Sequence, residues 1–373
     1  MNTILKMPFY AKSTLILLGL ISITYIINIG QNIIVPIVMS FLFAVLLDPI
    51  VLFLKSKLHF PHTFAAIIAV FLFVIIVVSL VAFLCYEISE MMNDFNKIER
   101  NINIHFANIQ RFVSENLHLS FREQNKYIES ATDDSMEKGK EIIGSTLLSF
   151  TDTILNIILI PIYTFLILLY RTHFMLFLSK LFDREYHLQL RDILNQIKVS
   201  VKSYIVGLII EMMLVSVLTT LGFMIIGVKY AILLGIITGI LNLVPYIGIL
   251  FAGILSIIAT LTGSPDVSII IGVIVVNIIV QIIDNNILFP LIVSSKVEVN
   301  ALATIIGIII GGAIAGISGM FLAIPILAIL KVIFDRIDSL NSWGYFFGVH
   351  MPKTYTWRNL KLHKFNSDSE SKK

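Results

Sequence analysis

The polar side chains best suited to chemistry lie inside long apolar segments. Four of them occupy positions i, i+4, i+7 and i+8 of the apolar run 267–292, which places them on one face of a helix. They are Asn277, Gln281, Asp284 and Asn285. Amide and carboxylate groups are costly in a bilayer, so this face needs a hydrated pathway or polar partners. It is interpreted either as a substrate or ion pathway or as a polar stripe that joins helices.

Two further carboxylates lie within apolar segments. Glu211 is about two turns from the start of segment 204–226, and it is expected either to bind a proton or cation or to hydrogen-bond a neighbouring helix. Asp48, in the run Leu47-Asp48-Pro49, lies near the end of its segment. It is expected to be a solvated or capping carboxylate there.

Glycines are concentrated in the C-terminal half, where most of the twenty lie between Gly222 and Gly319. Two apolar segments, 235–248 and 307–325, are interrupted by glycine and proline, and such a pair indicates a transporter binding site. The alternative role of these glycines is close helix packing. The residues expected to shape the backbone are Gly207, Gly235, Gly239, Pro245, Gly248, Pro290, Gly311, Gly312, Gly316, Gly319 and Pro325.

The motifs of common enzyme and nucleotide sites are absent from the sequence. It contains no G-x-x-x-x-G-K-[ST], no H-E-x-x-H and no G-x-S-x-G, so a P-loop ATPase, a zinc protease and a serine hydrolase are excluded. Cys85 is the sole cysteine, and the net charge of +3 is small. The sequence therefore predicts no catalytic residues, no metal site, no cofactor and no nucleic-acid partner.

The composition indicates a membrane protein, because 57% of the residues are apolar and only 14% are charged. A soluble domain carries roughly 25% charged residues. We expect an all-α, polytopic fold with about eight transmembrane helices, of which the long sixth and eighth are candidates for re-entrant hairpins. The predicted spans lie near 13–30, 33–54, 63–85, 149–170, 204–226, 231–260, 267–292 and 301–330.

Five regions follow from these spans. Residues 1–85 carry the first three helices, and residues 86–148 form an extracytoplasmic insert. In the insert, an amphipathic helix is expected to continue the third span and a second helix to return, giving a hairpin that packs on itself or contacts another subunit. Residues 149–203 hold the fourth helix and a cytoplasmic interfacial helix. A glycine-rich transport core, 204–330, precedes the tail 331–373.

Lysines and arginines predict the orientation. Lys6 and Lys12 precede the first span, Lys55 and Lys57 follow the second, and further basic residues lie between the fourth and fifth spans and in the tail. With eight crossings, all four regions fall on the cytoplasmic side. Both termini are therefore expected in the cytoplasm.

Several motifs are similar to those of one family of membrane permeases. They are Tyr204-x-x-Gly207, Gly227-Val-Lys-Tyr-Ala231, Leu233-Leu-Gly235, Asn242-Leu-Val-Pro245-Tyr246-Ile-Gly248, Asp284-Asn285-Asn286-x-x-x-Pro290, and Gly311-Gly312-x-x-x-Gly316-x-x-Gly319 ending in Ala323-x-Pro325. On these residues the chain resembles the autoinducer-2 exporter-type permeases over nearly its whole length. Two positions depart from the family's pattern: Leu208, where members often have glutamine, and Asn300-Ala301, where they often have a His-Pro pair.

The resemblance implies a multi-pass permease of the bacterial inner (plasma) membrane that works without ATP hydrolysis and forms homo-oligomers. Some relatives are assigned export of autoinducer-2 and others sodium/proton antiport. Our first hypothesis is a secondary transporter that exports a small polar solute such as autoinducer-2. The alternatives are a sodium/proton antiporter, with a monovalent cation and a proton as ligands, and a non-transporting membrane scaffold that acts through its external hairpin.

In either transport hypothesis the lipid bilayer is a partner, and the pathway lies in residues 204–330. The residues expected to line it are Glu211, Asn242, Tyr246, Asn277, Gln281, Asp284 and Asn285.

Overall fold

The computed structural model describes residues 8–93, 150–245, 247–260, 266–293 and 298–349, and every regular element among them is a helix. The predicted all-α fold class is therefore confirmed for the described residues. The rest of the predicted external hairpin, 94–149, lies outside them, as does Tyr246.

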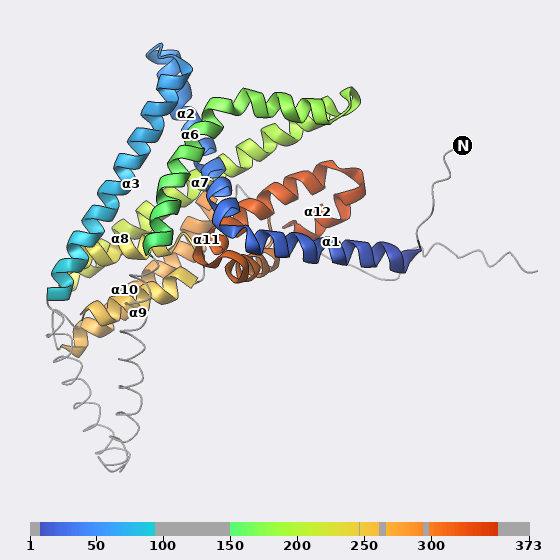
Figure 1. Cartoon of the computed structure of the whole chain (residues 1–373). Helices are drawn as coiled ribbons and strands as arrows, with labels where there is room; N and C mark the ends of the chain where they lie inside the picture. The colour runs from blue at the N-terminus through green and yellow to red at the C-terminus, as the bar shows by residue number, and fades with distance from the viewer. Residues whose placement is uncertain (1–7, 94–149, 246, 261–265, 294–297, 350–373) are drawn as a thin grey trace, which may run out of the picture.

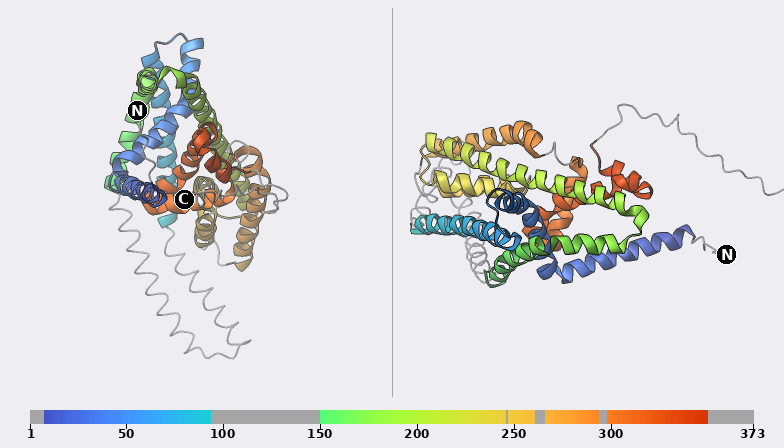
Figure 2. Two further views of the ribbon diagram at one scale, coloured as in Figure 1. Left: turned by 90° about the vertical axis from the view of Figure 1, so that its right-hand side faces the viewer. Right: turned by 90° about the horizontal axis from the view of Figure 1, so that it is seen from above.

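The N-terminal helices pack around α2. Three alanines of α3, Ala65, Ala66 and Ala69, are fully buried, and they pack with Leu47 and Val51 of α2. Small side chains at these positions let the two helices approach closely. Figure 1 shows α2, α3 and α6 side by side, while α1 projects away from them (Figure 2). The helices are α1 (Phe9–Ile29), α2 (Gln31–Lys57), α3 (His62–Asn93) and α6 (Phe150–Leu181).

α7 (His187–Ile225) is a single helix of 39 residues. Its N-terminal part includes the stretch expected to be a separate interfacial helix, and the structure has no break near residue 203. Ile197 and Val201 of this stretch are buried in a cluster with Leu42 of α2 and Leu322 of α11. These apolar side chains therefore pack against other helices of the same chain.

Segment 231–260 is a helical hairpin. It consists of α8 (Ala231–Leu241) and α9 (Ile247–Thr260). Gly248 lies against the main chain of Leu241 at the tip, and Ala259 packs with Ala231 at the open end. The two helices therefore run antiparallel.

α11 (Ala301–Arg336) also folds back on itself. Its backbone is non-helical at Ala315 and Gly316, where Gly316 has φ 57° and ψ −141°. A Cβ on Gly311 would lie 2.3 Å from the carbonyl oxygen of Gly319, so the parts on either side of the break pack together. Both glycine-rich segments are thus helical hairpins. Their depth in the bilayer stays a prediction.

Between the two hairpins lie α10 (Val267–Ile283) and η2 (Asp284–Val293), which continues α10 as a π-helix and contains Pro290. π-Helical segments are rare and frequently occur at functional sites. The chain ends, within the described residues, in η4 (Asp338–Leu340) and α12 (Asn341–Phe347). A short η1 (Arg184–Tyr186) precedes α7.

The expected number of about eight spans is not confirmed. Six helices of the described part are long and apolar enough to cross a membrane. The apolar part of α1, Ser13–Ile29, is shorter than these six, and segment 231–260 is the pair of short helices described above. The six are Gln31–Lys57, His62–Met91, Ile158–Leu181, Arg184–Ile225, Val267–Val293 and Ala301–Arg336.

Large apolar side chains cover the outside of these helices. On α3, Phe64 and Phe71 are 60% and 63% exposed, and on α10 Ile278 is 53% exposed. So much apolar surface is unfavourable in water, whereas lipid tails cover it at no cost. The chain is accordingly a multi-pass membrane protein.

Candidate transport site

Glycines bring α7, α8 and η2 into direct contact. A Cβ on Gly239 of α8 would lie 2.0 Å from the Ser216 hydroxyl of α7. On the other side of α7, a Cβ on Gly207 would lie 2.7 Å from the carbonyl oxygen of Ile292 in η2. Any larger residue at these positions would push the helices apart. The glycines predicted to shape the backbone therefore also set the spacing of the site.

Three polar side chains converge where these elements meet. They come from the middle of α7, the end of α8 and the start of η2. The side-chain nitrogen of Asn242 donates to Glu211 Oε1 at 3.3 Å and to Asp284 Oδ2 at 3.1 Å. All three residues are at most 4% exposed. The sequence placed Glu211, Asn242 and Asp284 on a common pathway, but not in a shared hydrogen-bond network.

Within the part of the chain that the structure describes, the two carboxylates of this cluster have no positive partner. Among the described residues, the ion pairs found elsewhere involve neither Glu211 nor Asp284. The Asn242 amide donates one hydrogen bond to each carboxylate. Such a bond compensates the charge of a carboxylate less than a Lys or Arg would. A buried charge without such compensation is strongly unfavourable. The site is therefore suited to a ligand that brings positive charge, namely a proton or a small cation.

Further hydrogen-bonding atoms along α7, α10 and η2 are buried without a partner in the described structure. Native proteins rarely leave such atoms unsatisfied, so each one indicates water or a ligand. They are Tyr204 OH, Glu211 Oε2, Thr219 Oγ1, Asn277 Nδ2, Gln281 Oε1 and Asp284 Oδ1.

Asn285 does not join this cluster. It is exposed, whereas its neighbour Asp284 is buried. One residue turns a helix by about 100°, so the side chain of Asn285 points in a different direction from that of the preceding Asp284. Tyr246, the remaining predicted pathway residue, lies outside the described residues.

Thr219 and Thr238 are buried polar residues that sequence reasoning missed. Thr219 lies eight positions after Glu211, two turns along the same face of α7. Thr238 lies one turn before Asn242, and its hydroxyl donates to the carbonyl oxygen of Leu234. The helical spacing from the two predicted residues was the available signal. Threonine is common enough in apolar helices that spacing alone does not single it out.

The other residues predicted to shape the backbone fall at turns and contacts. Pro245 is buried in the tip of the α8–α9 hairpin, next to Asn242. In α11, a Cβ on Gly312 would lie 2.7 Å from Met320 Cε, and Pro325 is buried within the second part of the helix.

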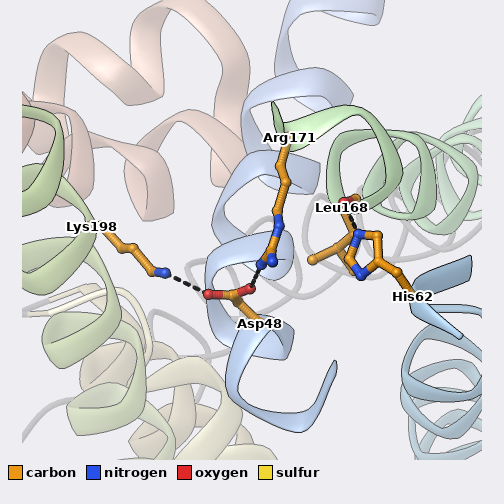
Figure 3. A network of polar contacts seen from close by, with 5 residues as sticks. All are labelled: Asp48, His62, Leu168, Arg171 and Lys198. Atoms are coloured by element: carbon orange, nitrogen blue, oxygen red, sulfur yellow. Dashed lines mark hydrogen bonds and ion pairs between the residues drawn. The ribbon is translucent and has the colours of Figure 1, made fainter. Parts of the chain in front are cut away.

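A second polar network lies outside this cluster and joins three helices (Figure 3). Asp48 of α2 is 6% exposed, so the expectation that it is solvated is wrong. It accepts from Arg171 of α6 at 2.6 Å and from Lys198 of α7 at 2.5 Å, and the two cations approach it from opposite sides. Beside it, His62 of α3 forms a 3.0 Å hydrogen bond with the carbonyl oxygen of Leu168. The network connects the N-terminal helices to α7.

The fold and the site together define a class of protein: a polytopic membrane protein whose apolar helices enclose a buried acidic cluster. The model of the AI-2E family transporters matches residues 14–339. The chain therefore belongs to the AI-2E transporter family, and it is a transport protein and not an enzyme.

Relatives of similar length support the same conclusion. YueF of Bacillus subtilis (strain 168), named as a transport protein, is 24% identical over 82% of this chain and 84% of its own length. YhhT of Escherichia coli (strain K12), also named as a transport protein, is 21% identical over 91% of this chain and 95% of its own. YrrI of Bacillus subtilis is 31% identical over a shorter part, 37% of this chain.

Proposed function

We propose that the protein is a secondary transporter in which Glu211, Asn242 and Asp284 form the site that binds the coupling ion, a proton or a monovalent cation. The observation that carries this proposal is the single Asn242 amide nitrogen that serves two buried carboxylates with no basic partner among the described residues. A bound cation or proton compensates their charge, and its release leaves the charge uncompensated. Binding and release can therefore change the stability of one arrangement of these helices relative to another.

The acids favour a cation as the ligand of this site over a neutral solute. A neutral, hydroxyl-rich solute such as autoinducer-2 is recognised well by amides such as Asn277 and Gln281, but it does not offset the charge of two carboxylates. Two modes of transport follow. In sodium/proton antiport the cation is itself the cargo, and in coupled export it drives the movement of a small polar solute such as autoinducer-2.

The experiment compares both cargoes in one preparation. The purified protein is reconstituted in liposomes, a pH gradient is imposed, and uptake of sodium and of autoinducer-2 is measured with and without the gradient. Antiport predicts gradient-driven sodium flux in the absence of any solute. Coupled export predicts autoinducer-2 flux that requires the gradient.

Substitutions then test the site. Asp284→Asn and Glu211→Gln keep the side-chain shape and remove the titrating group, so each is expected to abolish the dependence of flux on the pH gradient. Glu298→Gln is the matched control, because Glu298 is an exposed acid a few residues after η2. Flux that keeps its full dependence on the gradient in both acid variants contradicts the proposal.

A further inference from the structure

The cluster of Glu211, Asn242 and Asp284 belongs to a polar section that is enclosed between two apolar layers. On α7 the buried residues from Leu208 to Phe223 include two polar side chains, Glu211 and Thr219, with the apolar Val215 between them. The same order, apolar then polar then apolar, recurs on the two elements that pack against α7. On α8 and its tip it runs Leu234, Thr238, Asn242, Val244. Along α10 and η2 it runs Val273, Asn277, Gln281, Asp284, Val293, and Val280 is also buried between Asn277 and Gln281.

The apolar residues form two separate clusters. One surrounds the turn between α7 and α8, and we call it the outer layer: Phe223, Leu234, Ala259 and Val273. The other lies toward the basic N-terminal part of α7, and we call it the inner layer: Leu208, Val244 and Val293. The names follow the predicted orientation, in which the basic part of α7 is cytoplasmic.

We propose that the outer and inner layers are the two gates of the transport site, and that this structure holds the site closed at both ends. The proposal rests on the proposed function, since it assigns the access routes to the same acidic cluster. Phe223 and Val273 are fully buried, and Leu208 and Val293 are nearly so. A tightly packed apolar layer excludes water and is a barrier to ions.

The polar section needs a ligand or water that neither layer can provide. Thr219 Oγ1, Asn277 Nδ2 and Gln281 Oε1 are buried and have no partner among the described residues, in addition to one oxygen of each acid. These atoms follow the helices for about two turns between the layers. Their side chains match a small hydrated cation or a few waters, and in a functioning transporter these must enter through one layer and leave through the other.

One element contributes to both layers. The α8–α9 hairpin supplies Leu234 and Ala259 to the outer layer and Val244, from its tip, to the inner layer. It also supplies Asn242 to the site between them. A tilt of this hairpin against α7 that separates one layer presses the other together. The hairpin can therefore open the two gates in alternation.

Cysteine labelling tests this arrangement without relying on transport. The sole cysteine, Cys85, is exposed, so a Cys85→Ser background is cysteine-free, and Thr219→Cys in that background reports access to the polar section. A membrane-impermeant methanethiosulfonate is added to either side of sealed vesicles. With both gates intact, Thr219→Cys is expected to react at least about tenfold more slowly than Glu298→Cys in the same background, because Thr219 is fully buried and Glu298 is exposed between two spans.

Gate variants should open access from opposite sides. Phe223→Ala weakens the outer layer and Leu208→Ala the inner one, and each is expected to raise the labelling rate of Thr219→Cys at least about tenfold, since removing buried carbons destabilises the packed layer. For each variant the labelling rate should rise only when the reagent is added to one side of the vesicles, and that side should differ between the two variants. Ile225→Ala and Val199→Ala, at exposed positions of α7, are the matched controls and should leave it unchanged.

Smaller deletions keep the test valid if these variants fail to fold. Val273→Ala and Val244→Ala remove less volume from the outer and inner layers, and each preparation is checked for a single size-exclusion peak. The proposal is wrong if Thr219→Cys is labelled quickly without any gate variant, or if none of the four gate variants changes its labelling rate. It is also wrong if the outer-layer and inner-layer variants raise the rate from the same side. Labelling does not depend on flux, so a liposome assay without transport would contradict the proposed function and leave this result standing.

Discussion

Asn242 donates a 3.1 Å hydrogen bond to Asp284, from the tip of the α8–α9 hairpin to the first residue of the π-helix η2. The same nitrogen reaches Glu211 on α7 at 3.3 Å. A hairpin tip is therefore tied by one amide to the two helices on which it packs. The strength of that connection depends on whether the acids carry charge, so occupancy of the site and the position of the hairpin are linked.

Asn242→Leu is expected to lower transport at least about tenfold and also to destabilise the protein. Leucine is close to asparagine in volume but donates nothing, and leaving a buried polar group unsatisfied costs about 1–3 kcal/mol. Flux in liposomes and the free energy of unfolding in detergent measure the two effects. Asn285→Leu is the matched control, since Asn285 is exposed and should retain transport. Similar flux in both variants would argue against a role for the Asn242 amide.

Gly207→Ala should destabilise the packing of α7 against η2. The added methyl group would lie 2.7 Å from a main-chain carbonyl oxygen, which cannot rotate away as a side chain can, and overpacking of this kind costs about 1–3 kcal/mol. Gly253→Ala, in α9, has no atom within 4 Å of the added carbon. It should be neutral or slightly stabilising, because alanine favours the helix. Equal unfolding free energies for the two variants would contradict this packing.

The acidic cluster shows what the sequence can predict. Helical spacing placed Asn277, Gln281 and Asp284 on one face, because a long apolar run has one regular geometry. Asn285 was assigned to that face as well, and it is exposed because it lies about 100° around the helix from Asp284. Pro290 alone does not predict a π-helix, since proline also fits a kinked α-helix.

The convergence of Glu211, Asn242 and Asp284 could not be read from spacing. It depends on how closely α8 and η2 approach α7, which Gly239 and Gly207 determine. The sequence identified these glycines but not their partners, because contacts between helices are set by three-dimensional packing. In contrast, the interruptions of segments 235–248 and 307–325 correctly indicated broken helices, since glycine and proline disfavour helical backbone locally.

Gly316→Ala tests the turn of the α11 hairpin. Gly316 has φ 57° and ψ −141°, a backbone conformation that is essentially confined to glycine and costs other residues about 1–3 kcal/mol. No atom lies within 4 Å of an added Cβ, so the loss should come from backbone strain and not from a clash. The free energy of unfolding should fall by a similar amount for Gly316→Ala and Gly316→Ser. A much larger loss for serine would indicate crowding instead.

The Asp48 network predicts non-additive losses. Arg171→Met and Lys198→Met each remove one cation and keep an apolar stem. The side chains of Arg171 and Lys198 are 38% and 50% exposed, and Asp48 retains the other partner in each single variant. Each single loss should therefore stay near the value for a surface pair, about 0–1 kcal/mol.

The double variant leaves the buried Asp48 carboxylate without a partner. Removing one partner of a fully buried ion pair costs about 3–5 kcal/mol. The loss should be smaller here, because the side chains of Arg171 and Lys198 are partly exposed. Its loss of unfolding free energy should exceed the sum of the two single losses by at least about 1 kcal/mol. Asp48→Asn provides the internal control, because in that background position 48 carries no charge and the same double substitution should cost little. Additive losses in the Asp48 protein, or equal losses in both backgrounds, would mean that the ion pairs do not hold α2, α6 and α7 together.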